Sequence, residues 1–173
     1  AQARRSAELF TGTEIADGRV AEIERAVRAR LENIVLIGMP GSGKSSVAQM
    51  LGERLGREVV ECDAYIEEKA GKRIPAIFAE GGETEFRRLE TEALRELGKR
   101  SGIILSTGGG CVTRSENYPL LHQNGTIFWL LRSPWKLPSE GRPLSQAESA
   151  EAMYARREPM YRRFADVKID NEG

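Results

Sequence analysis

The sequence has few cysteines, one histidine and no long apolar run. Its two cysteines, Cys62 and Cys111, are too few for the disulfide framework of a small secreted domain, so we expect two free thiols in a reducing cytoplasm. No apolar run approaches the roughly 18 residues that a membrane span requires. No signal-peptide pattern is visible either. These absences predict a cytoplasmic protein that has no membrane segment.

An excess of charge of either sign is also lacking. The chain has 26 basic and 26 acidic residues, so net charge gives no reason to expect nucleic acid or an anionic membrane as a partner. Its 173 residues suggest one domain with room for a hydrophobic core. The only histidine, His122, has no nucleophile or metal partner spaced near it. A surface or capping role is therefore favoured for His122 over a catalytic one.

One motif of high specificity is present. An apolar run at 34–37 is followed by an octet that fits G-x-x-x-x-G-K-[ST] and then by a helical pattern. Glycines there let backbone N–H groups approach phosphate oxygens, and the helix directs its positive end at the same anion. Lys44 is expected to reach the β- and γ-phosphates, and Ser45 to hold Mg²⁺. The residues expected to form this nucleotide site are Gly38, Met39, Pro40, Gly41, Ser42, Gly43, Lys44, Ser45 and Ser46.

Apolar periodicity predicts alternating strands and helices from residue 33 onward. The expected strands are 33–37, 58–62, 102–107, 126–131 and 165–170. The expected helices are about 19–31, a segment after the phosphate loop that ends at Gly56, 64–70, about 83–99, 114–123 and 146–157. Turn signals mark residues 1–18, glycines and a proline interrupt 71–82, and three prolines exclude regular structure at 132–145. This alternation predicts an α/β fold with a mostly parallel sheet.

Two candidates follow predicted strands. Ligands bind beyond the carboxyl ends of strands in open α/β sheets, so Asp63 is a candidate to orient or deprotonate an acceptor. Asp63 could equally be the N-cap of the helix at 64–70. The three glycines Gly108, Gly109 and Gly110 suggest close approach of the backbone to a ligand, although a flexible turn would also use them.

Two arginines are candidates for anion binding. Arg87 and Glu90 lie three residues apart on a predicted helix. They are either a surface ion pair or, if they face a cleft, an anion clamp that Glu90 holds in place. Arg142 lies in the proline-rich segment, where it is either the arginine of a lid over the transferred phosphate or a solvated residue of a plain surface loop.

Six blocks together resemble the shikimate kinase family over residues of about 33–171. These blocks are GMPGSGKS, CDAYIEE, FAEGGETEFRRLE, ILSTGGGCV, GRPLS and REPMYRRFADVKID, in the family's order. The resemblance implies a P-loop, nucleoside-monophosphate-kinase-like three-layer α/β sandwich with a central parallel sheet. It also implies transfer of the γ-phosphate of ATP to the 3-hydroxyl of shikimate, with Mg²⁺, in aromatic amino-acid biosynthesis.

The resemblance assigns roles to individual residues. Arg87 and Arg157 would bind the shikimate carboxylate, and Asp63 would bind its hydroxyl groups. Arg142 would be the lid arginine that contacts ATP. The other residues implied to contact shikimate are Gly108, Gly109, Gly110, Phe78 and Phe86. Lys44, Asp63 and Arg142 would be the catalytic residues.

The sequence departs from the family pattern at four places. Glu61 stands where many members have aspartate, and the lid from Ser133 to Leu144 looks short. The family normally continues past Gly173 through an adenine-contacting loop and a final helix. Residues 1–31 resemble the C-terminal tail of shikimate dehydrogenase, as in a dehydrogenase–kinase fusion. We therefore expect an N-terminal extension at 1–31 and a shikimate kinase-like domain at 32–173, and we expect a monomer.

Three other functions compete with that of a shikimate kinase. A GTPase switch needs an N-K-x-D motif, which the chain lacks after the phosphate loop. A catalytically weak kinase domain of a larger shikimate-pathway fusion is compatible with Glu61 and with the missing final helix. A kinase for another small hydroxylated acceptor is disfavoured if Arg87 and Arg157 share a site, because a neutral acceptor would not need two arginines.

Overall fold

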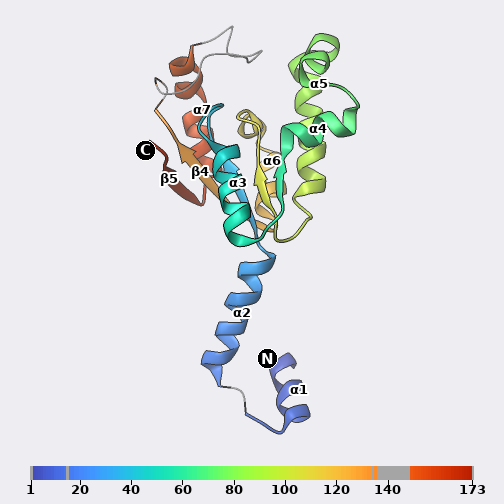
Figure 1. The fold of residues 1–173 in the computed structure, drawn as a ribbon, viewed down its shortest axis with the longest axis vertical. Coiled ribbons are helices and arrows are strands. Elements are labelled where there is room, and N and C mark those ends of the chain that lie inside the picture. The colour runs from blue at the N-terminus through green and yellow to red at the C-terminus, as the bar shows by residue number, and fades with distance from the viewer. Residues whose placement is uncertain (1, 15, 134, 136–148, 173) are drawn as a thin grey trace.

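The computed structural model describes residues 2–14, 16–133, 135 and 149–172. A five-stranded sheet forms the centre of the body, and two helices, α1 (Gln2–Thr11) and α2 (Asp17–Leu31), extend away from it (Figure 1). The strands are β1 (Asn33–Ile37), β2 (Val59–Glu61), β3 (Ile104–Ser106), β4 (Gly125–Leu131) and β5 (Val167–Asp170). Their order is β2-β3-β1-β4-β5, and every neighbouring pair is parallel.

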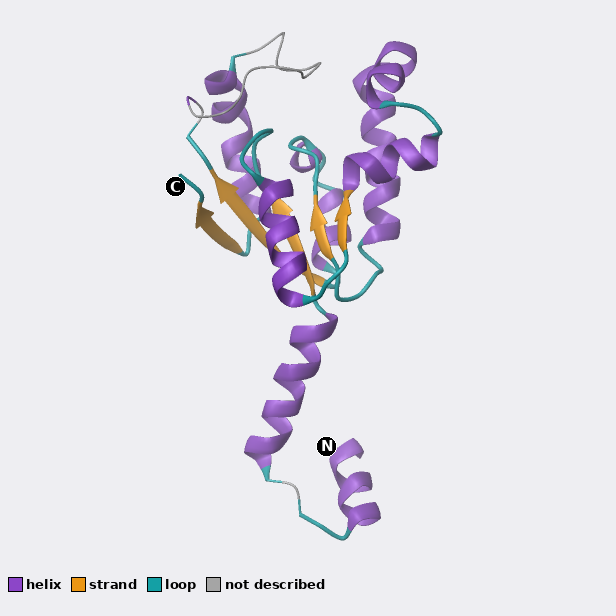
Figure 2. Ribbon diagram, viewed as in Figure 1, coloured by secondary structure: helices purple, strands orange, loops and turns teal. Residues whose placement is uncertain are grey.

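Helices cover both faces of this sheet (Figure 2). They are α3 (Lys44–Leu55), α4 (Cys62–Ala70), α5 (Ile74–Leu97), the 3₁₀ turn η1 (Cys111–Thr113), α6 (Asn117–His122) and α7 (Ala150–Phe164). Alternate side chains of β1 divide the core, as strand geometry requires. Leu36 packs with Ala48 of α3 on one face, whereas Val35 and Ile37 join the larger cluster on the other. The expected three-layer α/β architecture with a central parallel sheet is confirmed.

Most predicted elements are present, with shifted ends. All five strands and the helices at 19–31 and after the phosphate loop are found where the periodicity placed them. Gly56 ends α3 in the left-handed conformation, as predicted. The helix expected at 114–123 is the shorter α6, which follows the unexpected 3₁₀ turn η1, and α7 continues past Arg157 to Phe164 despite Pro159.

Three expectations are wrong. Residues 2–11 form a helix, although the turn signals at 1–18 gave no sign of one. The helix predicted at about 83–99 does follow a break, since Gly82 (φ 67°, ψ −170°) is not helical, but residues 74–81 before the break are also helical, which the glycines and the proline gave no sign of, so that α5 spans Ile74–Leu97. Asp63 is not a helix cap: it lies in the first turn of α4, and the capping position belongs to Glu61, whose side chain makes no capping bond.

The structure also places the one histidine and the two cysteines. His122 lies near the amino edge of the sheet, where its Nε2 is 3.0 Å from Asp166 Oδ1, in agreement with the expected surface role. Cys62 and Cys111 are both free and buried. Among the helices of the described residues, none is long and apolar enough to cross a membrane.

Candidate active site

The phosphate loop wraps around the amino end of α3 and is held from two sides. Lys44 Nζ donates to the carbonyls of Gly38 and Met39, at 3.0 and 2.9 Å, so the lysine lies buried inside its own loop. The side-chain amide of Asn171, just after β5, donates to Ser42 O at 2.7 Å. Gly38 has a φ of 148°, and a Cβ there would lie 2.6 Å from Leu130 O, so the motif needs glycine at this position.

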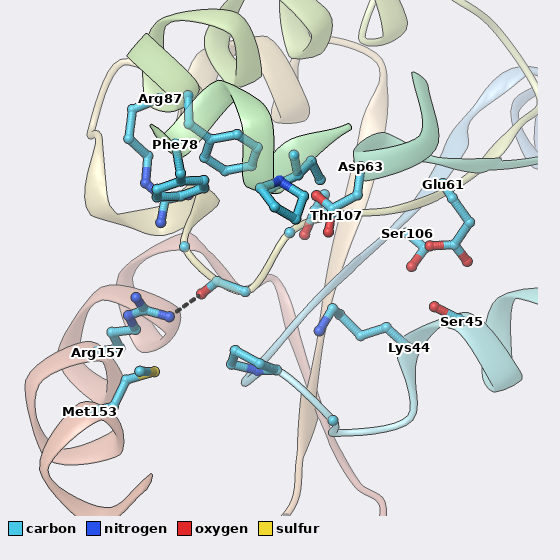
Figure 3. A pocket seen from close by; sticks show the side chains of 18 of the residues that line it. Lys44, Ser45, Glu61, Asp63, Phe78, Arg87, Ser106, Thr107, Met153 and Arg157 are labelled. Atoms are coloured by element: carbon cyan, nitrogen blue, oxygen red, sulfur yellow. Dashed lines mark hydrogen bonds between the residues drawn. The ribbon is translucent and has the colours of Figure 1, made fainter. Parts of the chain in front are cut away.

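A cavity of about 430 Å³ opens beside this loop at the carboxyl edge of the sheet (Figure 3). The loop and α3 supply one wall, β2 and the start of α4 a second, α5 a third, and α7 a fourth. The predicted site residues that line it are Pro40, Gly41, Lys44, Ser45, Asp63, Phe78, Phe86, Arg87, Gly108, Gly109, Gly110 and Arg157. The sheet topology therefore brings together residues that are more than 100 positions apart in the sequence.

The other predicted residues either lie beside the cavity or fall outside the residues that the structure describes. Gly38, Met39, Ser42, Gly43 and Ser46 belong to the loop or to the start of α3 but do not line the cavity. Met39 is a core residue, 3% exposed. Arg142 lies outside the described residues.

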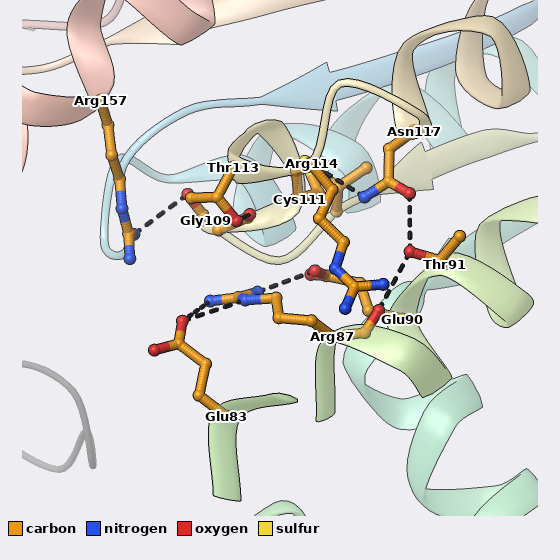
Figure 4. Close-up of polar contacts among 12 residues, drawn as sticks. Glu83, Arg87, Glu90, Thr91, Gly109, Cys111, Thr113, Arg114, Asn117 and Arg157 are labelled. Atoms are coloured by element: carbon orange, nitrogen blue, oxygen red, sulfur yellow. Dashed lines mark hydrogen bonds and ion pairs between the residues drawn. The ribbon is translucent and has the colours of Figure 1, made fainter. Parts of the chain in front are cut away.

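Arg87 is at the centre of a buried ionic group on α5 (Figure 4). Arg87 is only 5% exposed, and its guanidinium donates to Glu90 Oε2 at 2.8 Å and to Glu83 Oε1 at 3.1 and 3.2 Å. Glu90 is fully buried, and its Oε1 has no hydrogen-bond partner. Burial raises the pKa of Glu90 to about 7, although Arg87 opposes the rise. Arg87 and Glu90 are therefore a buried ion pair with Arg87 lining the cavity, and the surface-pair alternative is wrong.

Arg157 approaches the cavity from α7. It is 2% exposed, and its Nη1 donates to Gly109 O at 3.2 Å. The Tyr161 hydroxyl donates to the same carbonyl, so two side chains of α7 hold the glycine turn. A Cβ on Gly110 would lie between 2.1 and 2.5 Å from the Arg87 guanidinium. The position next to Arg87 therefore requires glycine.

An apolar wall completes this part of the cavity. The rings of Phe78 and Phe86 lie 4.9 Å apart, and the Phe86 ring also contacts the Arg87 guanidinium, whose carbon lies 5.2 Å from the ring centroid. The cavity thus has two cationic groups on one side and aromatic carbon on another. This combination suits a small ring that carries a carboxylate.

Asp63 lines the cavity, where the charges of both Lys44 and Arg87 act on its carboxyl group. Burial raises the pKa of its carboxyl, and the Lys44 ammonium nearby lowers it. Such a carboxylate can accept a hydrogen bond from a hydroxyl group and, with its raised basicity, can receive the proton. Asp63 is therefore placed to act on an acceptor that lies between Arg87 and Lys44.

Oxygen donors suited to a magnesium ion lie beside the lysine. Ser45 and Glu61 line the same cavity, and Glu61 Oε1 is buried without a hydrogen-bond partner. Mg²⁺ prefers oxygen ligands and usually takes only one or two from protein, the rest coming from phosphates and water. The donor set therefore fits Mg²⁺. A cluster of three acidic side chains among the described residues is not required, because phosphates and water supply the other ligands.

Sequence reasoning missed several residues that line the cavity or hold its residues. Ser106 and Thr107 line the cavity at the end of β3, and the rule that ligands bind beyond strand ends could have found them. The contacts of Glu83 and Tyr161 had no sequence signal, because each depends on tertiary packing. The remaining lining residues that were missed are Arg73, Ile74, Pro75 and Met153.

Comparisons with known proteins agree with this geometry. Residues 40–173 match the family model described as shikimate kinase. The chain belongs to the shikimate kinase family. A shikimate kinase from Cupriavidus pinatubonensis is 41% identical over 147 residues, which cover 80% of this chain and 77% of that protein. One from Prochlorococcus marinus is 42% identical over 139 residues, covering 75% and 72%.

Solved structures of shikimate kinases have the same fold. The enzyme from Acinetobacter baumannii in complex with shikimate is 34% identical and superposes with a TM-score of 0.73, covering 83% of this chain and 86% of that one. The enzyme from Aquifex aeolicus is 30% identical, with a TM-score of 0.71 and coverage of 82% and 87%. The expectation of a P-loop, nucleoside-monophosphate-kinase-like fold is confirmed.

Proposed function

We propose that this chain transfers the γ-phosphate of ATP to the 3-hydroxyl of shikimate, giving shikimate 3-phosphate and ADP. One observation carries the proposal: two buried arginines, Arg87 and Arg157, share a cavity with the lysine of a phosphate loop. A neutral acceptor would not offset the free-energy cost of burying two cations, whereas a carboxylate would pair with both.

The proposed binding mode assigns each wall one part of the substrates. Arg87 and Arg157 bind the shikimate carboxylate, and the phenylalanines Phe78 and Phe86 pack against its ring. The turn of Gly108, Gly109 and Gly110 lies close against the same ring. Shikimate is thereby oriented with its carboxylate toward the arginines and a hydroxyl toward Asp63.

Positioning and charge neutralisation then supply most of the catalysis, as in other phosphoryl transfers. Asp63 orients the attacking hydroxyl and accepts its proton, while Lys44 balances negative charge on the transferred group. On nucleotide binding the phosphates would replace the loop carbonyls as partners of Lys44 Nζ. Arg142 would contribute a further cation from the lid segment, which also excludes water.

A magnesium ion would bind at Ser45 and Glu61. When bound, it would neutralise negative charge on the phosphates of ATP. Glu61 reaches farther than the aspartate that many family members have here, and its buried oxygen without a hydrogen-bond partner supports a role in holding the ion or its water.

A coupled assay of ADP release, with MgATP and with or without shikimate, tests the function directly. We expect turnover that depends strongly on shikimate. No turnover with ATP binding retained would point instead to a catalytically weak domain. ADP release that shikimate does not stimulate would contradict shikimate as the acceptor. Asp63→Asn should lower kcat by roughly 10²–10⁴-fold, while ATP binding is kept.

Two further proposals concern the role of residues 1–31 and the location of the protein in the cell. We propose that residues 1–31 are an N-terminal extension of the kinase domain at 32–173, joined in a longer chain to a dehydrogenase of the same pathway. An open reading frame without dehydrogenase sequence upstream would contradict this. A cytoplasmic location is supported by the two free, buried thiols.

A further inference from the structure

Two buried polar side chains, Thr91 and Asn117, connect α5 to the end of the glycine turn. Thr91 lies on α5, one helical turn after Arg87, and Asn117 begins α6. Neither side chain lines the cavity, and the two residues are 5% and 0% exposed. Thr91 Oγ1 lies 2.9 Å from Asn117 Oδ1, and Asn117 Nδ2 donates to Cys111 O at 2.8 Å (Figure 4). A chain of hydrogen bonds therefore runs from α5 to the residue that follows Gly110.

The hydroxyl proton of Thr91 completes this chain. Thr91 Oγ1 also lies 3.0 Å from Arg87 O, but a hydroxyl group carries only one proton. The hydrogen-bond ladder of α5 already supplies a donor to Arg87 O. Asn117 Oδ1 has no other donor among the residues that the structure describes. The proton is therefore needed at Asn117, where a buried amide oxygen without a donor would cost free energy.

The link matters because Arg87 and Gly110 are packed against each other. The close approach that a Cβ on Gly110 would make to the Arg87 guanidinium shows that no space separates the two. Gly110 is held through its carbonyl, which accepts from Thr113 N at 3.0 Å and from Thr113 Oγ1 at 2.7 Å. The hydrogen bonds of Thr91 then set how far α5 lies from this turn, and hence where the guanidinium lies.

Hydrogen bonds are suited to setting such a distance because their strength depends steeply on length and angle. Thr91 and Asn117 are both desolvated, so a shift of α5 relative to the turn would leave a buried polar group without its partner. A displacement of about 1 Å in a group that binds a substrate can lower activity by roughly a hundredfold. Residues outside the cavity can therefore control how well Arg87 binds an anion.

We propose that Thr91 and Asn117 are positioning residues for the carboxylate of the acceptor. They do not touch the substrate, and they act by fixing the distance between Arg87 and the glycine turn. The inference rests on the proposed function, which assigns Arg87 to the carboxylate of shikimate. Loss of the link should weaken the binding of shikimate and leave that of ATP nearly unchanged, because the phosphate loop forms a different wall of the cavity.

Steady-state kinetics of Thr91→Val and Thr91→Ser test the link. Valine has the shape of threonine without the hydroxyl, so Thr91→Val should raise the KM for shikimate about tenfold and change that for ATP by less than about twofold. Thr91→Ser keeps the hydroxyl but loses a buried methyl group, so its KM for shikimate should stay within about twofold of that of the unchanged chain. Urea unfolding should show lower stability in both variants. A rise in the KM for shikimate that followed stability, and so appeared in both variants, would overturn the proposal.

A second pair of variants separates the position of a buried asparagine from its burial. Asn117→Ala should raise the KM for shikimate about tenfold, and adding Thr91→Val should raise it little further, because both changes break one link. The matched control is Asn33, which is 2% exposed and lies at the start of β1, where it bonds Arg100 O at 2.7 Å and Ile103 N at 3.0 Å. Asn33→Ala should lower stability and leave both KM values unchanged. An equal rise in the KM for shikimate in Asn33→Ala and Asn117→Ala would contradict a positioning role.

The unchanged chain is measured first, so that two different failures can be distinguished. Absence of shikimate-dependent turnover would overturn the proposed function. Normal turnover with a KM for shikimate that Thr91→Val leaves unchanged would overturn the positioning role alone. Calorimetric titration with shikimate in the absence of nucleotide provides a readout without turnover, and Thr91→Val should raise the Kd for shikimate about tenfold there as well.

Discussion

Glu83 Oε1 lies 3.1 Å from Arg87 Nη2, so a carboxylate of the protein itself contacts the guanidinium that we assign to shikimate. Arg87 holds a second carboxylate, Glu90, which is fully buried, whereas the Glu83 side chain is 50% exposed. The two acids therefore differ in how easily they can be displaced. Glu90 is a fixed partner of Arg87, and Glu83 can leave for water when a substrate carboxylate arrives.

Removal of the Glu83 charge should improve shikimate binding. In Glu83→Gln the substrate carboxylate no longer competes with an internal anion, so we expect the KM for shikimate to fall about three- to tenfold with the KM for ATP unchanged. Steady-state kinetics in both substrates measure this. Glu85→Gln is the matched control, because Glu85 lies on the same helix but pairs with the exposed Arg88. A raised KM in Glu83→Gln would mean that Glu83 helps to hold the substrate.

Loss of Arg87 should affect the two substrates unequally. Arg87→Ala leaves Glu90 buried without its cation and removes one side of the carboxylate site, so the KM for shikimate should rise by roughly 10²–10³-fold and that for ATP only slightly. Arg88→Ala, one residue away and half-exposed, should change neither value. An equal loss for both substrates in Arg87→Ala would refute the assignment of Arg87 to shikimate.

Substitutions of two neighbouring glycines should likewise change the KM values for the two substrates unequally. A Cβ on Gly110 meets the Arg87 guanidinium, whereas a Cβ on Gly109 lies 2.6 Å from Pro40 of the phosphate loop. Gly110→Ala should therefore raise mainly the KM for shikimate, and Gly109→Ala mainly that for ATP, each by about tenfold. The contrast between the two variants is the measurement. If both variants changed the two KM values equally, the glycines of the turn would act on both substrates together, and the separate assignments would be wrong.

The raised pKa of Glu90 predicts a loss of stability as pH increases. Its pKa rises from an ordinary 4.5 to about 7 on folding, so the folded state binds the proton more tightly than the unfolded state does. The stabilisation is complete below about pH 4.5 and is lost as pH rises to about 7, by roughly 3 kcal/mol. Urea unfolding across this range should show the decrease, and Glu90→Gln should remove it. An equal slope in Glu90→Gln would assign the effect to other groups.

The phosphate loop and the strand ends could be predicted because their signals are local. Buried parallel strands appear as continuous apolar runs, and an octet rich in glycine leaves little choice of conformation. These two rules gave Lys44, Asp63 and the glycine turn at 108–110. The two arginines were assigned to the site only through the family resemblance, since spacing alone left Arg87 open to a surface position.

Other parts of the site depend on contacts that no local pattern encodes. Thr91 and Asn117 are buried and hydrogen-bonded to each other, and Asn117 also donates to Cys111 O, which ties α5 to the segment after the glycine turn (Figure 4). Partners so distant in the sequence are brought together only by the fold. The helical stretch before Gly82 was missed because glycines and a proline usually interrupt helices, whereas here Pro75 lies in the first turn, where a helix accepts proline.

The sheet order also has a consequence for how the protein reaches its native state. Ile34 of β1 pairs with Ile104 on one side and with Thr126 on the other, so both neighbours of the central strand are at least 70 residues away along the chain. Closing such long loops costs entropy before any pairing compensates for it, which slows folding. During synthesis the phosphate loop is therefore made early but immobilised late. Until β4 has emerged, the most specific motif in this sequence has no fixed shape with which to bind a nucleotide.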